Sequence, residues 1–234
     1  MPSDTPEYSM RHLVINPFKM HLSDAILATH LAKSAEGPEE VKSMHSRTAV
    51  AHAVFALECA ANCFLALVPR NHQFRDKAEM WPILDKFDLY LLSLPHRPAI
   101  PRDHPTVTKL NHLIKVRDAH VHPKKMKMKV TESKLPGVSF KIDFQGVHSS
   151  GLSPAHFSWT HTDASKAISI VLDFLRLLMG LSGMSSNQLA FNLATLMECD
   201  DGCRETEFGN FNRLLNLSES IGVDVSFLLR KKEA

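Results

Sequence analysis

The stretch from Pro105 to Pro123, PTVTKLNHLIKVRDAHVHP, decides the fold expected for this chain. Its apolar side chains recur at helical spacing and predict an amphipathic helix with one core-facing stripe. The stripe consists of Val107, Leu110, Leu113, Ile114 and Val121. Arg117 falls on the same stripe, and Pro123 should end the helix at His122 because proline disfavours helical backbone at the preceding residue. The stretch therefore predicts a cation and an imidazole at one helix end.

Arg117 needs a partner, because an unpaired charge on a core-facing stripe is costly. Residues 49–68, AVAHAVFALECAANCFLALV, are apolar on nearly every face and predict a buried helix. Its one carboxylate is Glu58, and Asn62 lies four residues later on the same face. A lone carboxylate in such a helix should be paired. We therefore expect the two helices to pack with Glu58 against Arg117 and with Asn62 and His122 nearby.

Residues 117–122, RDAHVH, resemble the R-x4-6-H motif of the HEPN superfamily, in which a polar residue directly follows the arginine. Asp118 stands here where that family more commonly has Asn. Glu58 and Asn62 resemble the Glu and Asn positions of the family's second helix, and the resemblance covers residues 20–182. It implies a small all-α bundle, often dimeric. Such proteins either cleave RNA without metal or serve as non-catalytic modules that bind nucleotide or protein.

The reaction implied by the resemblance is phosphodiester cleavage that leaves a 2′,3′-cyclic phosphate. His122 would act as general base toward a ribose 2′-OH or as general acid toward the leaving oxygen, because an imidazole titrates near neutral pH. Arg117 would stabilise charge on the phosphorane, Asp118 would orient one of its donors, and Glu58 would hold it in place. The alternative is a structural Glu58–Arg117 ion pair, with His122 favoured at the helix end by the helix dipole.

Basic residues follow the motif directly, at Lys124, Lys125, Lys127 and Lys129. Lysines beside a phosphate-cleaving site would attract a polyanionic RNA. Their alternation with apolar residues predicts a strand. The alternative is therefore a solvated edge strand that its lysines protect from aggregation.

Metal and cofactor motifs are weak in this sequence. His120 and His122 form an H-x-H pair, but no third ligand follows at a fixed spacing. Cys199 and Cys203 match no standard zinc spacing. P-loop, G-x-S-x-G and H-E-x-x-H patterns do not occur. We therefore expect no metal and no cofactor.

The composition is that of an ordinary globular protein: 234 residues, 44% hydrophobic and 22% charged. A net charge of +2 permits a nucleic-acid partner without demanding one. The N-terminus lacks a signal-peptide pattern. Polar residues interrupt the longest apolar run, and four cysteines are few for a secreted scaffold. We expect a reduced, cytoplasmic protein without a membrane span, with RNA, a second copy, and an antitoxin or other protein as partners.

The whole chain predicts an all-α fold: a HEPN-like helical bundle with a small β-hairpin insertion and a helical C-terminal extension. Residues 1–185 would form the bundle, with the insertion at about 126–160, and residues 186–234 would pack on it. Hydrophobic spacing and turn residues predict a helix over about 23–35, with Ile26, Leu27 and Leu31 inward, and a second from about Glu39 or Ser46 to Leu67. Further helices are expected over 81–94 and 162–182, the latter ended by Ser182-Gly183 and with these residues inward: Ile168, Val171, Leu172, Leu175 and Leu178. Residues 186–197 and 210–230 predict two more helices. Strands are expected over 124–130 and 138–144, with a third over 157–159.

Overall fold

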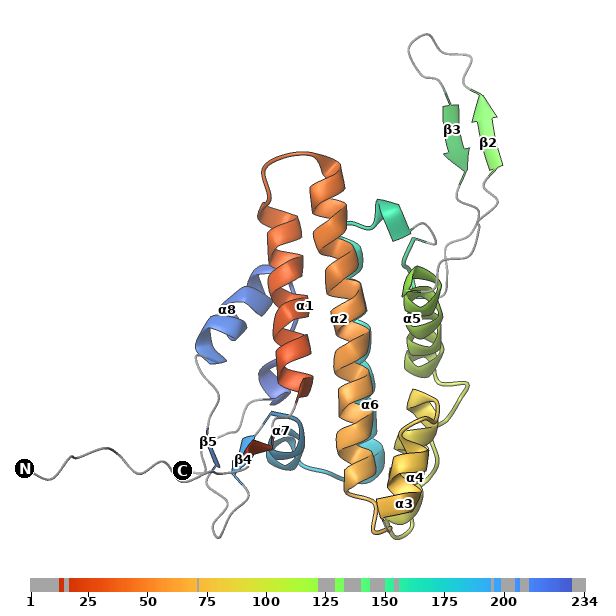
Figure 1. Cartoon of the computed structure of the whole chain (residues 1–234), viewed down its shortest axis with the longest axis vertical. Coiled ribbons are helices and arrows are strands. Elements are labelled where there is room, and N and C mark those ends of the chain that lie inside the picture. Colours follow the sequence, from red (N-terminus) through yellow and green to blue (C-terminus); the bar gives the residue numbers. More distant parts are fainter. Residues whose placement is uncertain are drawn as a thin grey trace, which may run out of the picture.

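The computed structural model describes residues 13–14, 17–70, 72–121, 129–132, 140–143, 150–153, 156–194, 196–198, 205–206 and 211–228. Within these residues eight α-helices form a bundle, which confirms the predicted all-α fold (Figure 1). The helices are α1 (Pro17–Ser34), α2 (Glu39–Ala66), α3 (His72–Ala78), α4 (Ile83–Ser93), α5 (Pro105–Val121), α6 (His161–Ser182), α7 (Ser186–Ala194) and α8 (Phe211–Ser220). The short strands are β1 (Leu13–Val14), β2 (Lys129–Glu132), β3 (Phe140–Asp143), β4 (Leu196–Glu198) and β5 (Glu205–Thr206).

The long helix α2 lies at the centre of the bundle. It runs antiparallel to α1, α6 packs behind it, and α4 and α5 line its other flank (Figure 1). Its buried face is rich in alanine, which has the highest helix propensity and allows neighbouring helices to approach closely. These fully buried alanines are Ala49, Ala53, Ala56, Ala60 and Ala61. The predicted central helix is present and begins at Glu39, the earlier of the two expected starts. One of its sides is half-exposed.

Among the described helices, α2 alone is long and apolar enough to cross a membrane. Of its most apolar window, 56% is buried inside the bundle. Such burial is typical of the core helix of a soluble domain, where apolar side chains face other helices instead of lipid.

The first helix differs from its prediction in both start and orientation. It begins at Pro17 because proline suits the first helical position and because the helix buries Phe18 in the core. Ile26 is buried as expected, whereas Leu27 and Leu31 are 42% and 41% exposed although inward positions were expected for them. The buried face contains three alanines, so size and hydrophobicity do not mark it in the sequence.

Helices α5 and α6 follow the predicted stripes closely. In α5, Val107, Leu110 and Leu113 are fully buried, but Val121 at the end of the same stripe is 41% exposed. A helical face stays buried only where a neighbouring element covers it, so the prediction for the last turn was wrong. The N-cap of α6 is Thr160, whose backbone N–H donates to Asp163 Oδ2 at 3.0 Å.

The C-terminus of α6 depends on a glycine. Gly183 follows the helix with a φ of 70°, in the left-handed region that glycine enters without strain. The guanidinium of Arg97 also lies against its Cα, so close that a Cβ would overlap it. The predicted Ser-Gly stop is therefore fulfilled by both conformation and packing.

Between α5 and α6 the chain departs from the predicted strands. β2 and β3 pair antiparallel, from Lys129 opposite Asp143 to Glu132 opposite Phe140, and lie beyond the end of α5 (Figure 1). In place of the third strand a 3-10 turn covers His156–Ser158. Trp159 after it is buried, and its Nε1 donates to the carbonyl of Ser153 at 2.8 Å. The large ring thus enters the core from a turn.

The C-terminal segment joins the same core as the rest of the chain. β1 pairs with β4 and β4 with β5, so a strand before α1 and two strands after α7 form one small sheet. Helix α8 packs on α1 (Figure 1). Side chains after residue 185 belong to the main hydrophobic cluster, among them Leu189, Leu193, Val223 and Val225. The described residues after 185 therefore pack on the bundle.

Candidate functional site

The half-exposed side of α2 carries a row of polar and aromatic side chains. Residues three and four apart on one helix face are neighbours. The row runs through His52, Phe55, Glu58 and Asn62, which are half-buried or exposed. Side chains from α1, α4 and α5 contact this row. Helix α2 is therefore the element that brings the candidate residues together.

Arg117 lies against Glu58, as expected from the sequence. Its Nη2 is 3.4 Å from Oε2 of Glu58, and its Nη1 is 3.4 Å from Oδ1 of Asp118. The arginine side chain is 12% exposed, whereas the two carboxylate side chains are 42% and 53% exposed. Its Cζ also lies 5.3 Å from the ring centre of Phe55, within the range of a cation–π contact. Two carboxylates and one ring thus hold the guanidinium in the last turns of α5.

The guanidinium has hydrogen-bonding capacity to spare. Its Nε is buried without a hydrogen-bond partner among the described residues. Both ion-pair distances exceed the roughly 2.7–2.9 Å of a tight charge-assisted hydrogen bond. Asp118 is the more exposed of the two carboxylates and can turn toward solvent. An anion that replaced Asp118 at Nη1 would leave the contact of Nη2 with Glu58 in place.

Four of the predicted site residues, His122, Lys124, Lys125 and Lys127, lie outside the described residues. Lys129 is described only through its backbone, as the first residue of β2. The catalytic role of the histidine and the RNA-binding role of the lysines stay predictions.

Asn62 lies beside a different cation from the one expected. Its Oδ1 accepts a hydrogen bond of 2.7 Å from Nζ of Lys86 in α4, and Lys86 is only 1% exposed. Burial lowers the pKa of Lys86, because desolvation disfavours the charged amine, while Glu58 and Glu79 act in the opposite direction. The two polar residues of α2 therefore have different partners: Glu58 faces Arg117 and Asn62 faces Lys86.

Sequence reasoning missed Lys86, although the signal that identified Arg117 is present there too. Lys86 lies three residues after Ile83 and four before Tyr90, both on the buried face of α4. A charged residue on an apolar stripe predicts a buried charge with a partner, and this holds for Lys86 as it does for Arg117.

The thiol beside Glu58 is not a candidate nucleophile. Burial, assisted by the charge of Glu58, raises the pKa of Cys59 to about 11. A thiol must be deprotonated to attack, so Cys59 stays an inert thiol near neutral pH.

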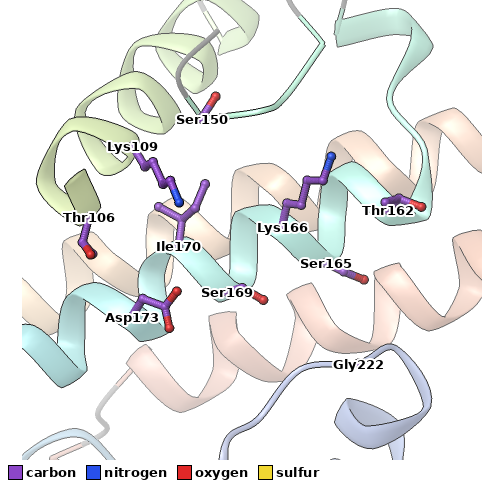
Figure 2. A pocket seen from close by; sticks show the side chains of 10 residues that line it. All are labelled: Thr106, Lys109, Ser150, Thr162, Ser165, Lys166, Ser169, Ile170, Asp173 and Gly222. Carbon is purple, nitrogen blue, oxygen red and sulfur yellow. The ribbon is translucent and has the colours of Figure 1, made fainter. Parts of the chain in front are cut away.

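A hollow of about 410 Å³ lies between α5 and α6 and is drawn in Figure 2. Thr106 and Lys109 line it from α5, and Lys166 lines it from α6, where its Nζ donates to the carbonyl of Gly151 at 3.2 Å. Further hydroxyl groups come from Ser150, Thr162, Ser165 and Ser169. Asp173 adds one carboxylate to the lining (Figure 2), and it is paired with Arg176 at 2.9 Å. With that charge paired, two ammonium groups and several hydroxyls suit an anionic, hydrogen-bonding ligand.

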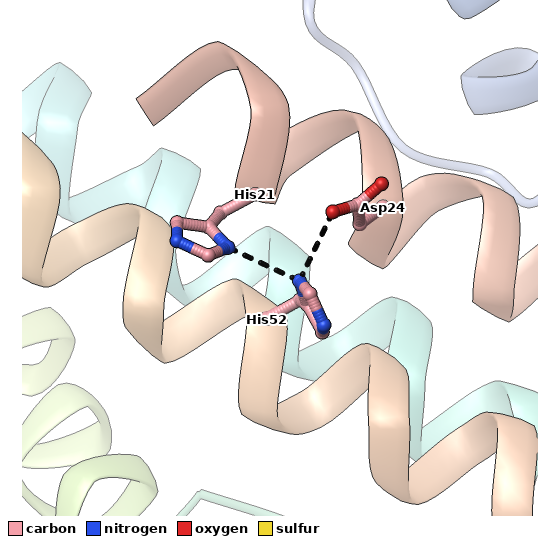
Figure 3. A group of neighbouring side chains, drawn as sticks. All are labelled: His21, Asp24 and His52. Carbon is pink, nitrogen blue, oxygen red and sulfur yellow. Dashed lines mark hydrogen bonds and ion pairs between the residues drawn. The ribbon is translucent and has the colours of Figure 1, made fainter. Parts of the chain in front are cut away.

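Three possible metal ligands converge where α1 meets α2, as Figure 3 shows. Nδ1 of His52 is 3.2 Å from Nδ1 of His21 and 3.4 Å from Oδ2 of Asp24. The rings of both histidines contact Phe55, with centroids 5.6 and 6.0 Å from that ring. The ring of Phe55 therefore contacts both this group and Arg117. His120 of the H-x-H pair does not belong to this group, and His122 lies outside the described residues.

Comparisons with known proteins provide no family for this chain. No protein-family model, no curated protein and no solved structure matches it.

Proposed function

We propose that this protein is a metal-independent endoribonuclease of HEPN type, in which Arg117 and His122 act on the scissile phosphate. The observation that supports the proposal is the contact of 3.4 Å between Arg117 Nη2 and Glu58 Oε2. A catalytic guanidinium must be held in place before substrate arrives, because positioned charge costs no reorganisation during the reaction. Glu58 provides that hold from a separate helix.

The division of roles follows from exposure. Glu58 anchors Nη2 of Arg117, and the more exposed Asp118 orients Nη1 until a phosphate oxygen replaces it. His122 is the next residue after the observed end of α5. It accepts the proton of the ribose 2′-OH while that oxygen attacks the phosphorus and water protonates the leaving oxygen, or it gives a proton to the leaving oxygen while water accepts that of the 2′-OH. Lys124, Lys125, Lys127 and Lys129 attract the RNA backbone. Two copies of the chain would bring two such sets together, since each site alone supplies few catalytic groups.

We propose that the protein acts in the cytoplasm, as a toxin with a cognate antitoxin or as a component of antiphage defence.

The test is cleavage of an end-labelled single-stranded RNA in EDTA. We expect the full chain to cut and His122→Ala to reduce the rate at least about 100-fold with an unchanged melting temperature. Arg117→Lys should also slow cleavage, because a lysine lacks the forked donors.

Matched controls are available on the same helix. His112→Ala and Lys115→Ala each remove one basic group from α5 outside the proposed site, and both should leave cleavage unchanged. The proposal is rejected if the unmodified chain cleaves none of the RNA substrates. It is also rejected if the two control variants lose as much of the cleavage rate as His122→Ala does.

A second candidate function is a non-catalytic module that binds a nucleotide. The hollow between α5 and α6 favours it, because Lys109, Lys166 and nearby hydroxyls can hold a phosphate and ribose. Titration with ATP and with AMP tests it by calorimetry. Lys109→Ala and Lys166→Ala should each weaken binding about tenfold, and Lys115→Ala should not. A chain that binds nucleotide but never cuts RNA supports this candidate over the first.

A further inference from the structure

The geometry points to a binding site for one divalent transition-metal ion, Zn²⁺ foremost, formed by His21 and Asp24 of α1 and His52 of α2. This metal site is separate from the proposed RNA-cleaving site, which acts without a metal. Asp24 follows His21 by three residues on α1, so both side chains leave the same face of that helix (Figure 3). His52 meets them from the neighbouring helix. One candidate ligand atom from each residue lies within 4.8 Å of the other two.

The distances between ligand atoms fit a metal. Zn²⁺ binds imidazole nitrogen and carboxylate oxygen at about 2.0–2.2 Å, so neighbouring ligands in a tetrahedron are about 3.3 Å apart. Nδ1 of His52 is 3.2 Å from Nδ1 of His21 and 3.4 Å from Oδ2 of Asp24. Asp24 is 53% exposed, which leaves its carboxylate free to close onto an ion. Both distances therefore match ligand–ligand spacings, and the third pair of atoms, from His21 and Asp24, lies within 4.8 Å.

Hydrogen bonds alone satisfy this group poorly. A carboxylate accepts only, so the contact with Asp24 requires the proton of His52 on Nδ1. Nδ1 of His21 then faces the same N–H and must offer a lone pair. Two acceptors, Nδ1 of His21 and Oδ2 of Asp24, thus face a single N–H, and the carboxylate contact of 3.4 Å is longer than an ordinary hydrogen bond. A cation can coordinate all three atoms at once.

The surroundings hold the two imidazoles in place. Phe55 packs against both rings and limits their movement. The exposed side, next to Asp24, is open for a water molecule as the fourth ligand.

The donor set also defines which ions should bind. Two imidazoles with one carboxylate suit Zn²⁺, Ni²⁺, Co²⁺ and Cu²⁺, whereas Mg²⁺ and Ca²⁺ prefer oxygen ligands throughout. Since the ligands come from two helices, a bound ion would join α1 to α2. An ion that binds only the folded chain raises its melting temperature.

The experiment is a calorimetric titration of the metal-stripped full chain with Zn²⁺, and separately with Mg²⁺, together with melting curves in each ion. We expect one Zn²⁺ per chain, a higher melting temperature in Zn²⁺, and neither effect in Mg²⁺. His21→Ala and His52→Ala should each weaken Zn²⁺ binding at least tenfold, because even partners of metal ligands contribute about 10–100-fold. Asp24→Asn should weaken it as well.

His45→Ala is the matched control, because it removes another histidine of α2 seven residues away and should leave affinity and stoichiometry unchanged. Circular dichroism verifies that each variant is folded. A chain that binds no Zn²⁺, or one whose binding survives both His52→Ala and Asp24→Asn, overturns the proposal. RNA cleavage in EDTA is measured in parallel, so failure of the metal site and failure of the nuclease function are read separately.

Discussion

Two cations contact α2 one helical turn apart, and the structure treats them differently. α5 places Arg117 beside the carboxylate of Glu58, and α4 places Lys86 beside the amide of Asn62. The arginine side chain keeps 12% of its surface exposed, whereas the lysine is 1% exposed. Both lie on otherwise apolar stripes, yet only one of them has a negatively charged hydrogen-bond partner.

The difference reflects what each group can do with its charge. A guanidinium stays protonated in any protein environment, so it needs a counter-charge and some access to solvent. An ammonium group responds to burial with a lower pKa, as Lys86 does, and a neutral acceptor can then suffice. Arg117 therefore offers a permanent positive charge near the surface. Lys86 instead has a structural role, because its hydrogen bond joins α4 to α2.

The largest expected effect comes from making the two sites alike. Lys86→Arg places a larger, permanently charged group where only an amide accepts. We expect a loss of about 3 kcal/mol in the free energy of unfolding, from overpacking and an uncompensated charge. Urea denaturation measures it, with Lys115→Arg on exposed α5 surface as control. A loss below about 1 kcal/mol would mean that Lys86 tolerates a fixed charge.

Removing the amide partner should have the next largest effect. Asn62→Ala leaves the buried amine of Lys86 without its acceptor and should cost about 2 kcal/mol. Asn62→Asp keeps an acceptor and adds a counter-charge, so it should cost clearly less than the alanine variant. Equal losses in urea denaturation would show that the hydrogen bond contributes little.

The lowered pKa of Lys86 predicts a pH dependence. Below the folded-state pKa the amine is charged in both states, and burial of that charge destabilises the folded chain. Between that pKa and the ordinary value of 10.5 the unfolded chain binds a proton that the folded chain has released, so stability rises with pH. The contribution is at most about 1.4 kcal/mol per pH unit.

Urea denaturation from pH 7 to above pH 10 measures this slope against Lys86→Met, which has no group to titrate. The stability of the unmodified chain should increase relative to the variant as pH rises. Parallel curves would show that Lys86 keeps its ordinary pKa.

The smallest effect should follow from weakening the arginine's partner. Glu58→Gln removes the charge of a side chain that is 42% exposed, and Asp118 remains beside Arg117. Solvent screening and the second carboxylate limit the expected loss to about 1 kcal/mol. A loss as large as that of Asn62→Ala would mean that the arginine is as dependent on its partner as the lysine.

How far the sequence predicts this protein depends on whether polar and apolar residues alternate clearly. The stripes of α5 and α6 predicted their buried residues and, through Arg117 on an apolar stripe, its contact with Glu58. The buried face of α1 is made largely of small residues, so Leu27 and Leu31 were placed inward and are exposed. Short polar α3 carries no such stripe and was not predicted.

By itself the sequence determined the all-α fold, the presence of a long central helix, and the need of Arg117 for an acid, because periodicity and the cost of a buried charge act within one helix. Only the tertiary structure decided which cation meets Asn62 and that His21, Asp24 and His52 converge. Those outcomes depend on how α1 and α4 are placed along α2, and that placement is set by the packing of many side chains from several helices at once.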